Sequence, residues 1–483
     1  MKHLSSCHSP FFCTLREKTA IPVNHSEKNC PVTVFFHYCP TNGTVLCYNI
    51  EKNMSYDSFF SMEDPMRIER NIYVQRLIDR MGNGLIKVIT GIRRSGKSYL
   101  LFNLFQEYLH KQGIPADHII SMAFDTLENR EYRNPETLMA YIRQRLGDSG
   151  VYYVLLDEVQ MLDHFEEVLN SLLHKPNVDL YVTGSNSRFL SKDVLTELRG
   201  RGDEIHIFPL SFQEFMQAYP GDMYHGWAEY VMYGGLPLTV TMKTDEQKSQ
   251  YLEHLFQETY LKDIKERNHI EREAEMENLL DILASSIGSL TNPSKIQATF
   301  TSRLKSSISV NTVHRYISYL EDAFLIHEAK RYDVKGRKYI GTPMKYYFED
   351  VGLRNARLNF RQVEETHLME NILYNELRMR GYHVDVGSVF QRYHDDDTGK
   401  RLSKQLEIDF VANLGSNRYY IQSAYQLPTE EKIRQEKASL MALDDSFKKI
   451  VIVRDIVKPF HDEHGILTIS LFDFLMKPGS LEY

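Results

Sequence analysis

An eight-residue segment, Gly91-Ile-Arg-Arg-Ser-Gly-Lys-Ser98, constrains the fold of this chain more than any other part of its sequence. It matches the pattern G-x-x-x-x-G-K-[ST], and it lies between an apolar run at residues 85–90 and an apolar-periodic segment at residues 99–108. The run is typical of a buried strand, and the periodic segment is typical of a helix. A strand, a glycine-containing loop and a helix in this order present backbone N–H groups and a helix N-terminus to a polyphosphate.

The residues of this loop predict how a bound nucleotide is held. Gly91 and Gly96 allow the backbone to curl so that successive N–H groups point at the phosphates. Lys97 is expected to reach the β- and γ-phosphates, and the Ser98 hydroxyl is expected to ligate Mg²⁺. The nucleotide-binding residues that we expect are Gly91, Ile92, Arg93, Arg94, Ser95, Gly96, Lys97, Ser98 and Tyr99.

A second apolar run, residues 151–156, ends in Asp157 and Glu158 about 55 residues after the loop. A continuous apolar strand suits the middle of a parallel sheet covered on both faces, and ligands bind at the C-terminal ends of such strands. We expect Asp157 to hold the hydrated Mg²⁺ and Glu158 to orient and deprotonate the attacking water. Two solvated acids at a strand end are the alternative. The adjacent glutamate favours hydrolysis over phosphate transfer to a second substrate.

Two further segments supply candidate contacts with the γ-phosphate. Residues 179–186 predict a strand that ends in a small polar cluster, where Asn186 or Ser185 would sense the γ-phosphate. A capped strand-to-helix turn is the alternative there. Residues 198–202 place two arginines in a glycine-flexed turn. Arg201, with Arg199 in reserve, would contact the γ-phosphate of this subunit or a neighbour, whereas a solvated basic turn is equally compatible.

Composition limits the class of protein. The 483 residues suffice for roughly three domains, and 42% hydrophobic and 25% charged residues are ordinary for a globular chain. A net charge of −8 excludes nucleic-acid binding by bulk electrostatics, so any such contact must come from a local patch. No run of about 18 apolar residues occurs, and therefore no membrane partner is expected.

All five cysteines lie in the first 47 residues. Their spacings contain no C-x-x-C and do not resemble a zinc ribbon, and the first residues lack the apolar segment of an export signal. We expect residues 1–65 to be a poorly ordered extension, and a start at Met54, Met62 or Met66 is an alternative. The cysteine-free remainder fits a reducing cytoplasm.

Strand and helix patterns alternate from about residue 66 to residue 219, which predicts an α/β fold with a doubly wound parallel sheet. The expected strands are 85–90, 118–124, 151–158, 179–185 and 205–210. Ser211 and Glu214 form a capping-box pattern after the last of them. Residues 220–275 are expected to form a helical connector, in which the Gly-Gly-Leu-Pro turn begins a helix.

Residues 276–350 predict a winged helix-turn-helix. Ser309 is expected to cap its third helix, whose buried stripe contains Val310, Val313, Ile317 and Leu320. A basic hairpin follows, so either DNA or a protein partner could dock here. The candidate DNA contacts are Asn311, Thr312, His314, Arg315, Lys330, Arg331, Lys335, Arg337 and Lys338.

Residues 360–483 predict another α/β unit. A helix with Glu370, a strand with Asp409 and a third strand that should carry E-x-K form the arrangement of Mg²⁺-dependent nucleases. Gln422 and Ala424 stand at the third-strand positions, so a degenerate nuclease fold used for binding is favoured over cleavage. Lys404, Lys432 or Lys437 could replace the missing lysine from another position.

Several motifs together resemble the bacterial and archaeal AAA-type ATPases that carry a C-terminal domain of unknown function 4143. The segments that carry the resemblance are residues 91–98, 155–158, 183–186, 209–215, 233–237, 320–326, 369–371 and 407–410. The resemblance covers about residues 66–478. It implies ATP binding, ATPase activity, the winged helix and the nuclease-like tail, while residues 1–60 depart from it.

The sequence as a whole predicts a cytoplasmic, Mg²⁺-dependent P-loop ATPase whose nucleotide state switches two C-terminal modules. A nucleotide-gated binding module without hydrolysis and an ATP-regulated nuclease are the alternatives. The choice of ATP over other nucleotides rests on the resemblance. DNA, a protein partner and a homo-oligomer are the partners to be tested.

Overall fold

The computed structural model describes residues 37–38, 45–46, 67–184, 200–394 and 401–483 of the chain. The chain divides into two units, Met1–Pro65 and Met66–Tyr483. In the first unit the described residues are β1 (His37–Tyr38) and β2 (Val45–Leu46), which pair antiparallel. The predicted poor order of residues 1–65, and all five cysteines, lie outside the described residues.

A five-stranded parallel sheet begins the second unit, in the spatial order β4-β5-β6-β3-β7. Its strands are β3 (Ile86–Thr90), β4 (Ile119–Ala123), β5 (Tyr152–Asp157), β6 (Val178–Thr183) and β7 (Gly202–His206). The predicted α/β fold with a parallel sheet of the P-loop type is confirmed. The last strand begins at Gly202, earlier than the predicted start at residue 205.

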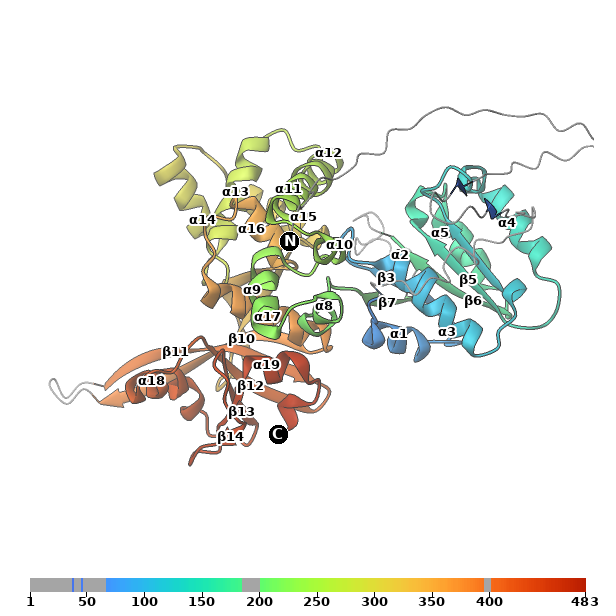
Figure 1. Cartoon of the computed structure of the whole chain (residues 1–483). Coiled ribbons are helices and arrows are strands. Elements are labelled where there is room, and N and C mark those ends of the chain that lie inside the picture. Colours follow the sequence, from blue (N-terminus) through green and yellow to red (C-terminus); the bar gives the residue numbers. More distant parts are fainter. Residues whose placement is uncertain (1–36, 39–44, 47–66, 185–199, 395–400) are drawn as a thin grey trace, which may run out of the picture. The chain divides into compact units, whose positions relative to one another are not determined.

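Helices cover both faces of this sheet (Figure 1). In β3, Ile86 and Val88 pack with α4 and α5 on one face, whereas Ile89 packs with α1 and the long helix that follows the glycine loop. These helices are α1 (Asn71–Ile78), α2 (Lys97–Tyr99), η2 (Leu100–Phe105), α3 (Gln106–Lys111), α4 (Pro135–Arg145) and α5 (Phe165–Leu173). Short 3-10 turns are η3 (Ala116–His118), η4 (Arg130–Arg133) and η5 (Val159–Met161). Because helices cover both faces, every residue of β3 and β5 is buried, including the polar Lys87, Thr90 and Asp157.

The connector is helical, as the sequence indicates. Its elements are α8 (Phe212–Ala218), α9 (Met223–Tyr233), α10 (Pro237–Thr241), α11 (Asp245–His254), η6 (Leu255–Leu261) and α12 (Lys262–Arg267). Ser211 and Glu214 form the predicted capping box of α8. The Gly234–Gly235 turn precedes α10, and the N–H of Gly235 donates to Asp350 at 2.8 Å. Asp350 therefore attaches this turn to the C-terminal part of the chain.

Three helices and a hairpin follow at the positions predicted for the winged helix. They are α13 (Glu273–Ser285), α14 (Pro293–Thr299), η7 (Phe300–Leu304), α15 (Val310–Asp322), β8 (Ile326–Asp333) and β9 (Lys338–Phe348). The Ser309 hydroxyl accepts from the N–H of Thr312 at 3.0 Å and so caps α15. Val313, Ile317 and Leu320 are buried, as expected from the stripe.

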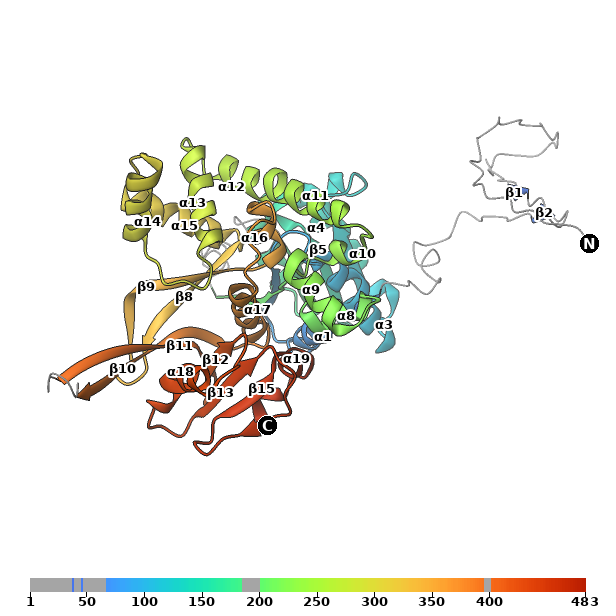
Figure 2. The same cartoon turned by 60° about the vertical axis from the view of Figure 1, so that its left-hand side comes forward.

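The hairpin is part of a larger sheet. Strand β8 crosses to β10 and pairs parallel with it (Figure 2). The eight strands follow the order β14-β15-β13-β12-β11-β10-β8-β9. The remaining elements are α16 (Val351–Arg357), α17 (Glu365–Met379), β10 (His383–His394), β11 (Arg401–Leu414), β12 (Asn417–Ala424), α18 (Glu430–Met441), β13 (Lys448–Val453), β14 (Phe460–His461), β15 (Leu467–Ser470), α19 (Leu471–Met476) and η8 (Ser480–Glu482). The sheet thus runs across the boundary predicted at residues 350–360. Among the described residues, no helix combines the length and the apolar content needed to cross a bilayer.

Candidate functional site

The loop between β3 and α2 has the backbone shape that a phosphate cradle needs. Gly91 has φ +136°, and a Cβ there would lie 2.2 Å from the carbonyl oxygen of Ile207, so only glycine fits. Gly96 has φ +95° and Arg94 has φ 66°, which turn successive peptide units. The Ser95 hydroxyl is buried and has no hydrogen-bond partner among the described residues. This unpaired donor and the turned peptide units fit the phosphates of a nucleotide.

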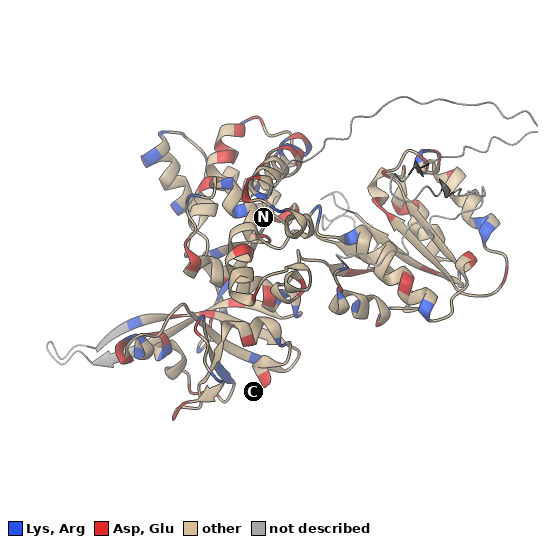
Figure 3. Ribbon diagram, in the orientation of Figure 1, with Lys and Arg blue, Asp and Glu red and all other residues tan. Residues whose placement is uncertain are grey.

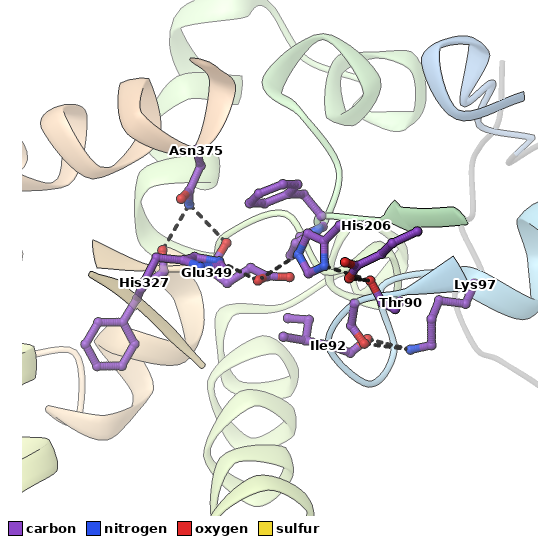
Figure 4. Close-up of polar contacts among 12 residues, drawn as sticks. Thr90, Ile92, Lys97, His206, His327, Glu349 and Asn375 are labelled. Carbon is purple, nitrogen blue, oxygen red and sulfur yellow. Dashed lines mark hydrogen bonds and ion pairs between the residues drawn. The ribbon is translucent and has the colours of Figure 1, made fainter. Parts of the chain in front are cut away.

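Lys97 lies inside this loop (Figure 4). Its Nζ donates to the carbonyl oxygens of Gly91 at 3.0 Å and Ile92 at 2.9 Å. Burial lowers the pKa of Lys97 to about 8, although the charges of Glu158, Asp157 and Glu349 oppose this shift. Phosphate oxygens could replace the two carbonyls as acceptors and would favour the charged ammonium. The structure therefore places Lys97 where the sequence analysis expects a phosphate ligand.

Ser98 and Asp157, the two predicted Mg²⁺ ligands, are brought together. Asp157 ends β5 and is buried, and a side-chain hydrogen bond joins it to Ser98. Burial raises the pKa of Asp157, whereas hydrogen bonds from Thr183 and Ser98 oppose that rise. A hydroxyl and a carboxylate in contact supply hard oxygen donors of the kind that hold hydrated Mg²⁺ beside a nucleotide.

Thr183 organises the two carboxylates and was not recognised from the sequence. It ends β6, the strand between β5 and β3, and its hydroxyl donates to Asp157. The same hydroxyl accepts from the N–H of Glu158 at 3.2 Å. One fully buried hydroxyl therefore fixes both the predicted metal ligand and the backbone of the predicted base.

Glu158 turns the chain sharply at the end of β5. Its φ of 54° lies in the left-handed region, which non-glycine residues rarely adopt and which often marks functional sites. Gln160 donates its side-chain amide to the Glu158 carboxylate, and the Glu158 charge raises the pKa of Lys97. Glu158 therefore lies on the same side of the sheet as the loop. Gln160 is a second residue that the sequence analysis missed.

The predicted γ-phosphate contacts have different outcomes. Asn186, Ser185 and Arg199 lie outside the described residues. Arg201 precedes β7 at the edge of the sheet opposite the loop, because its carbonyl accepts from Ile86 at the start of β3. Its guanidinium donates to Asn170 at 2.9 Å. Within one chain, the expected contact of Arg201 with a γ-phosphate is therefore wrong, and its action on a neighbouring subunit stays a prediction.

The backbone of the loop is held by residues from outside it. The Arg70 guanidinium donates to the Ser95 carbonyl at 2.8 Å and pairs with Glu214 at 3.1 Å. The Tyr260 hydroxyl, from η6 of the connector, donates to the Arg93 carbonyl at 2.6 Å. Any change in the loop backbone would therefore alter hydrogen bonds to the connector.

A polar network extends from the strand that precedes the loop toward the C-terminal sheet (Figure 4). The Thr90 hydroxyl donates to Glu204 at 2.8 Å and lies 3.1 Å from Nδ1 of His206. Nε2 of His206 is 3.1 Å from Glu349, and Nε2 of His327 is 2.8 Å from the same Glu349 oxygen. Although burial acts against the charged form, His206 and His327 lower the pKa of Glu349 to about 2. Glu349 is therefore a carboxylate beside two imidazoles.

A second buried cluster lies in the predicted nuclease-like part. Nζ of Lys345 is 2.8 Å from Glu370, 2.8 Å from Glu407 and 3.6 Å from Asp409. Burial opposes the charge of Lys345, but Glu370, Asp409 and Glu407 outweigh it and raise the pKa of the amine. Tyr347 also donates to Glu370 at 2.6 Å. The lysine of this cluster thus comes from β9, at a position that the sequence analysis did not consider.

The three lysines proposed as replacements for the missing nuclease lysine do not contact this cluster. Lys432 pairs with Glu436 at 2.5 Å, Lys437 pairs with Asp462 at 2.7 Å, and Lys404 is exposed. Their substitution for the missing nuclease lysine is therefore wrong.

The two residues at the third-strand positions supply neither the carboxylate nor the amine that a nuclease of this type needs. Ala424 is buried in the apolar core, and the Gln422 amide lies 3.4 Å from Glu436.

The candidate DNA contacts are mostly on the surface. Asn311, His314 and Arg315 are exposed on α15, and Lys330, Lys335, Arg337 and Lys338 are exposed in the hairpin. Arg331 is buried and its guanidinium donates to Ser388 at 3.4 Å, so its inclusion among the available basic residues was wrong.

Comparisons with known proteins agree with this geometry. Residues 83–216 match a family model described as an AAA domain, and residues 224–364 match a domain of unknown function, DUF8612. An uncharacterized protein of Haemophilus influenzae is 34% identical over 416 residues, which cover 85% of this chain and 99% of the relative. The chain belongs to the family of that protein. An uncharacterized protein of Methanocaldococcus jannaschii is 27% identical over 376 residues, 74% of this chain and 79% of the relative.

A search of solved structures found the Aeropyrum pernix ORC1 protein in complex with DNA. It shares 15% sequence identity at a TM-score of 0.25, over 61% of this chain and 94% of that chain. The AAA domain matched by the family model contains the whole loop, Lys97, Ser98, Asp157 and Glu158. It is a nucleotide-binding domain of the P-loop type. The C-terminal assignment to domain of unknown function 4143 stays a prediction.

Proposed function

We propose that this AAA-domain protein is a Mg²⁺-dependent ATPase. The observation that carries the proposal is the convergence of Lys97, Ser98, Asp157 and Glu158 around one glycine cradle. Lys97 would bind the terminal phosphates, while Ser98 and Asp157 would hold hydrated Mg²⁺, which neutralises charge on the phosphates. Glu158 would orient the attacking water and accept its proton.

Phosphate release under single- and multiple-turnover conditions tests the proposal. A Glu158→Gln variant should lose about 100-fold or more in turnover while retaining Mg·ATP binding, because the base is removed and the cradle is intact. Glu167→Gln, the same change at an exposed position in the first turn of α5, is the matched control. Equal turnover by the Glu158 variant would exclude hydrolysis by this base. Absence of turnover in the parent would favour a nucleotide-gated binding module instead.

We further propose that the nucleotide state changes how the loop is attached to the rest of the unit. Two contacts support this idea, Arg70 to the Ser95 carbonyl and Tyr260 to the Arg93 carbonyl. Peptide units that rotate toward phosphate would turn these carbonyls and alter both hydrogen bonds, which would shift the connector. A Tyr260→Phe variant removes one contact without changing the ring. It should bind Mg·ATP but lose any nucleotide-dependent change in hydrogen exchange of residues 255–267.

For the C-terminal modules we propose a winged helix that contacts DNA, followed by a degenerate nuclease-like fold. Exposed residues of α15 and the hairpin support the first part, namely Asn311, Arg315, Lys335, Arg337 and Lys338. Acidic and basic residues are interspersed elsewhere in the chain, so binding would rest on this local patch (Figure 3).

Fluorescence anisotropy with duplex DNA at two salt concentrations tests this contact. An Arg337→Gln/Lys338→Gln variant should weaken binding and reduce its salt dependence. Lys243→Gln/Lys458→Gln, which removes the same charge from two exposed sites, should not. If the parent shows no salt-dependent binding, a protein partner becomes the better assignment.

For the nuclease-like fold, the ammonium of Lys345 lies among the carboxylates that would otherwise hold Mg²⁺. Because the Lys345 ammonium takes the place of the metal ion, we propose that this fold binds DNA without cleaving it. The parent protein should therefore show no Mg²⁺-dependent nicking of plasmid DNA. Nicking that an Asp409→Ala variant abolishes would overturn this assignment and would favour the ATP-regulated nuclease.

A further inference from the structure

Three side chains of metal-ligating type meet where the AAA domain contacts the C-terminal hairpin (Figure 4). His206 ends β7, His327 lies near the start of β8, and Glu349 directly follows β9. One donor atom from each lies within 4.8 Å of the others. Tetrahedral Zn²⁺ with bonds of about 2.0–2.2 Å holds its donors roughly 3.3 Å apart. The observed separations of 3.1 Å and 2.8 Å from Glu349 are close to this value, and the ligand nitrogens of the two histidines lie within 4.8 Å of each other.

The hydrogen bonds of Thr90 determine which nitrogen of His206 carries a proton. The hydroxyl has one hydrogen, and it is donated to Glu204, whose carboxylate can only accept. The contact of 3.1 Å between the Thr90 oxygen and Nδ1 of His206 must then be donated by Nδ1–H. In neutral imidazole, Nε2 therefore presents a lone pair to the Glu349 oxygen. When His206 is neutral, two lone pairs face each other, and a cation between them, either a proton on Nε2 or a metal ion, resolves the conflict.

The surroundings of Glu349 point to the same requirement. Its side chain is 1% exposed, and its second oxygen, Oε1, is buried without a hydrogen-bond partner among the described residues. Aromatic rings surround the two histidines, with Phe208 and Phe324 centred 4.7 Å and 4.4 Å from His206. The histidine side chains remain 19% and 14% exposed, which leaves an approach for a fourth ligand such as water. A buried, under-coordinated carboxylate within an apolar shell is a favourable ligand for a metal ion.

We propose that His206, His327 and Glu349 bind one Zn²⁺-class divalent cation. Two imidazoles and one carboxylate suit zinc and its neighbours in the first transition series, whereas Mg²⁺ prefers oxygen ligands. The Glu204–Thr90–His206 chain supplies the outer hydrogen bonds that orient a metal-bound imidazole. This site is separate from the Mg²⁺ site at Ser98 and Asp157. The bound ion would link the end of β7 to the β8–β9 hairpin. Strand β7 pairs with β3, which leads into the loop.

The test uses the full-length chain without an affinity tag, stripped with chelator and dialysed against zinc. The parent should retain one zinc per chain, and Co²⁺ in its place should give the intense visible absorption of a tetrahedral site with nitrogen ligands. His206→Ala and His327→Ala should each lose the bound ion. His110→Ala, at an exposed position of α3, should retain it.

The outer hydrogen bond provides a second variant in case a ligand variant fails to fold. Thr90→Val removes the acceptor for Nδ1–H and should weaken zinc binding about 10–100-fold. Thr90→Ser, which retains the hydroxyl, should bind as the parent does. A parent without bound zinc, a weak octahedral Co²⁺ spectrum, or retention of zinc by either histidine variant would overturn the proposal.

Discussion

Lys345 offers the sharpest prediction about the C-terminal part, because its one ammonium lies among three carboxylates. Lys345 is 2% exposed, and two of the carboxylates lie 2.8 Å from its nitrogen. At an effective dielectric constant of about 20, each close pair has a gross attraction of about 6 kcal/mol, most of which desolvation offsets. A Lys345→Met variant leaves buried carboxylates facing each other. It should lower the free energy of unfolding by about 3–5 kcal/mol.

Urea denaturation measures this loss, and Lys437→Met is the matched control. Lys437 is also buried but pairs with one carboxylate, Asp462 at 2.7 Å, so its loss should be smaller. Without the amine, the remaining carboxylates repel each other and their pKa values rise. Stability of the Lys345 variant should therefore recover as pH falls through those values, or when Mn²⁺ is added. A Lys345 variant as stable as the parent, or no more sensitive to Mn²⁺ than the Lys437 variant, would refute this reasoning.

Three further predictions concern the AAA domain. Gly91→Ala should destabilise the fold by about 2–5 kcal/mol in urea unfolding, because its Cβ would clash with backbone, whereas Gly82→Ala in open space should lose only about 1–2 kcal/mol. Thr183→Val removes one of the two hydroxyl donors of Asp157 and should lose about 2–4 kcal/mol, while Thr183→Ser should lose less. Burial lowers the pKa of Lys97 to about 8, and phosphates bind the charged form. Calorimetry should therefore show Mg·ATP affinity falling up to about tenfold per pH unit above pH 8, and an affinity independent of pH would contradict this account.

The loop and its carboxylates could be predicted because their signals are local. The glycine spacing of Gly91 and Gly96 and the apolar strand before Asp157 each lie within a short segment. The positions of the strands along the chain and the capping by Ser211 and Ser309 follow from equally local patterns. In a parallel α/β sheet the C-terminal ends of the strands lie at one edge, so these segments were expected to lie close together.

The missed residues act across long sequence separations. Thr183 bonds to Asp157 from another strand, His206 and Glu349 are 143 residues apart, and Lys345 contacts Glu370 from β9. No pattern in one sequence specifies such pairs, because they depend on which strands become neighbours. The pairing of β8 with β10 was missed for the same reason.

Arg201 illustrates an error that a physical rule could have prevented. The turn that contains it precedes β7, and residues before a parallel strand lie at the N-terminal edge of the sheet. Ligands bind at the opposite edge. The strand also begins at Gly202 instead of residue 205, which leaves Arg201 directly at that edge.

The central claim is that the Gly91–Ser98 loop binds Mg·ATP through Lys97. Isothermal titration calorimetry of Mg·ATP into the parent, Lys97→Ala and Lys111→Ala tests it most directly, because Lys111 is an exposed lysine at the end of the same long helix. We predict that Lys97→Ala weakens binding by about 100-fold or more and that Lys111→Ala binds as the parent does. Equal affinity of the Lys97 variant and the parent would contradict the account.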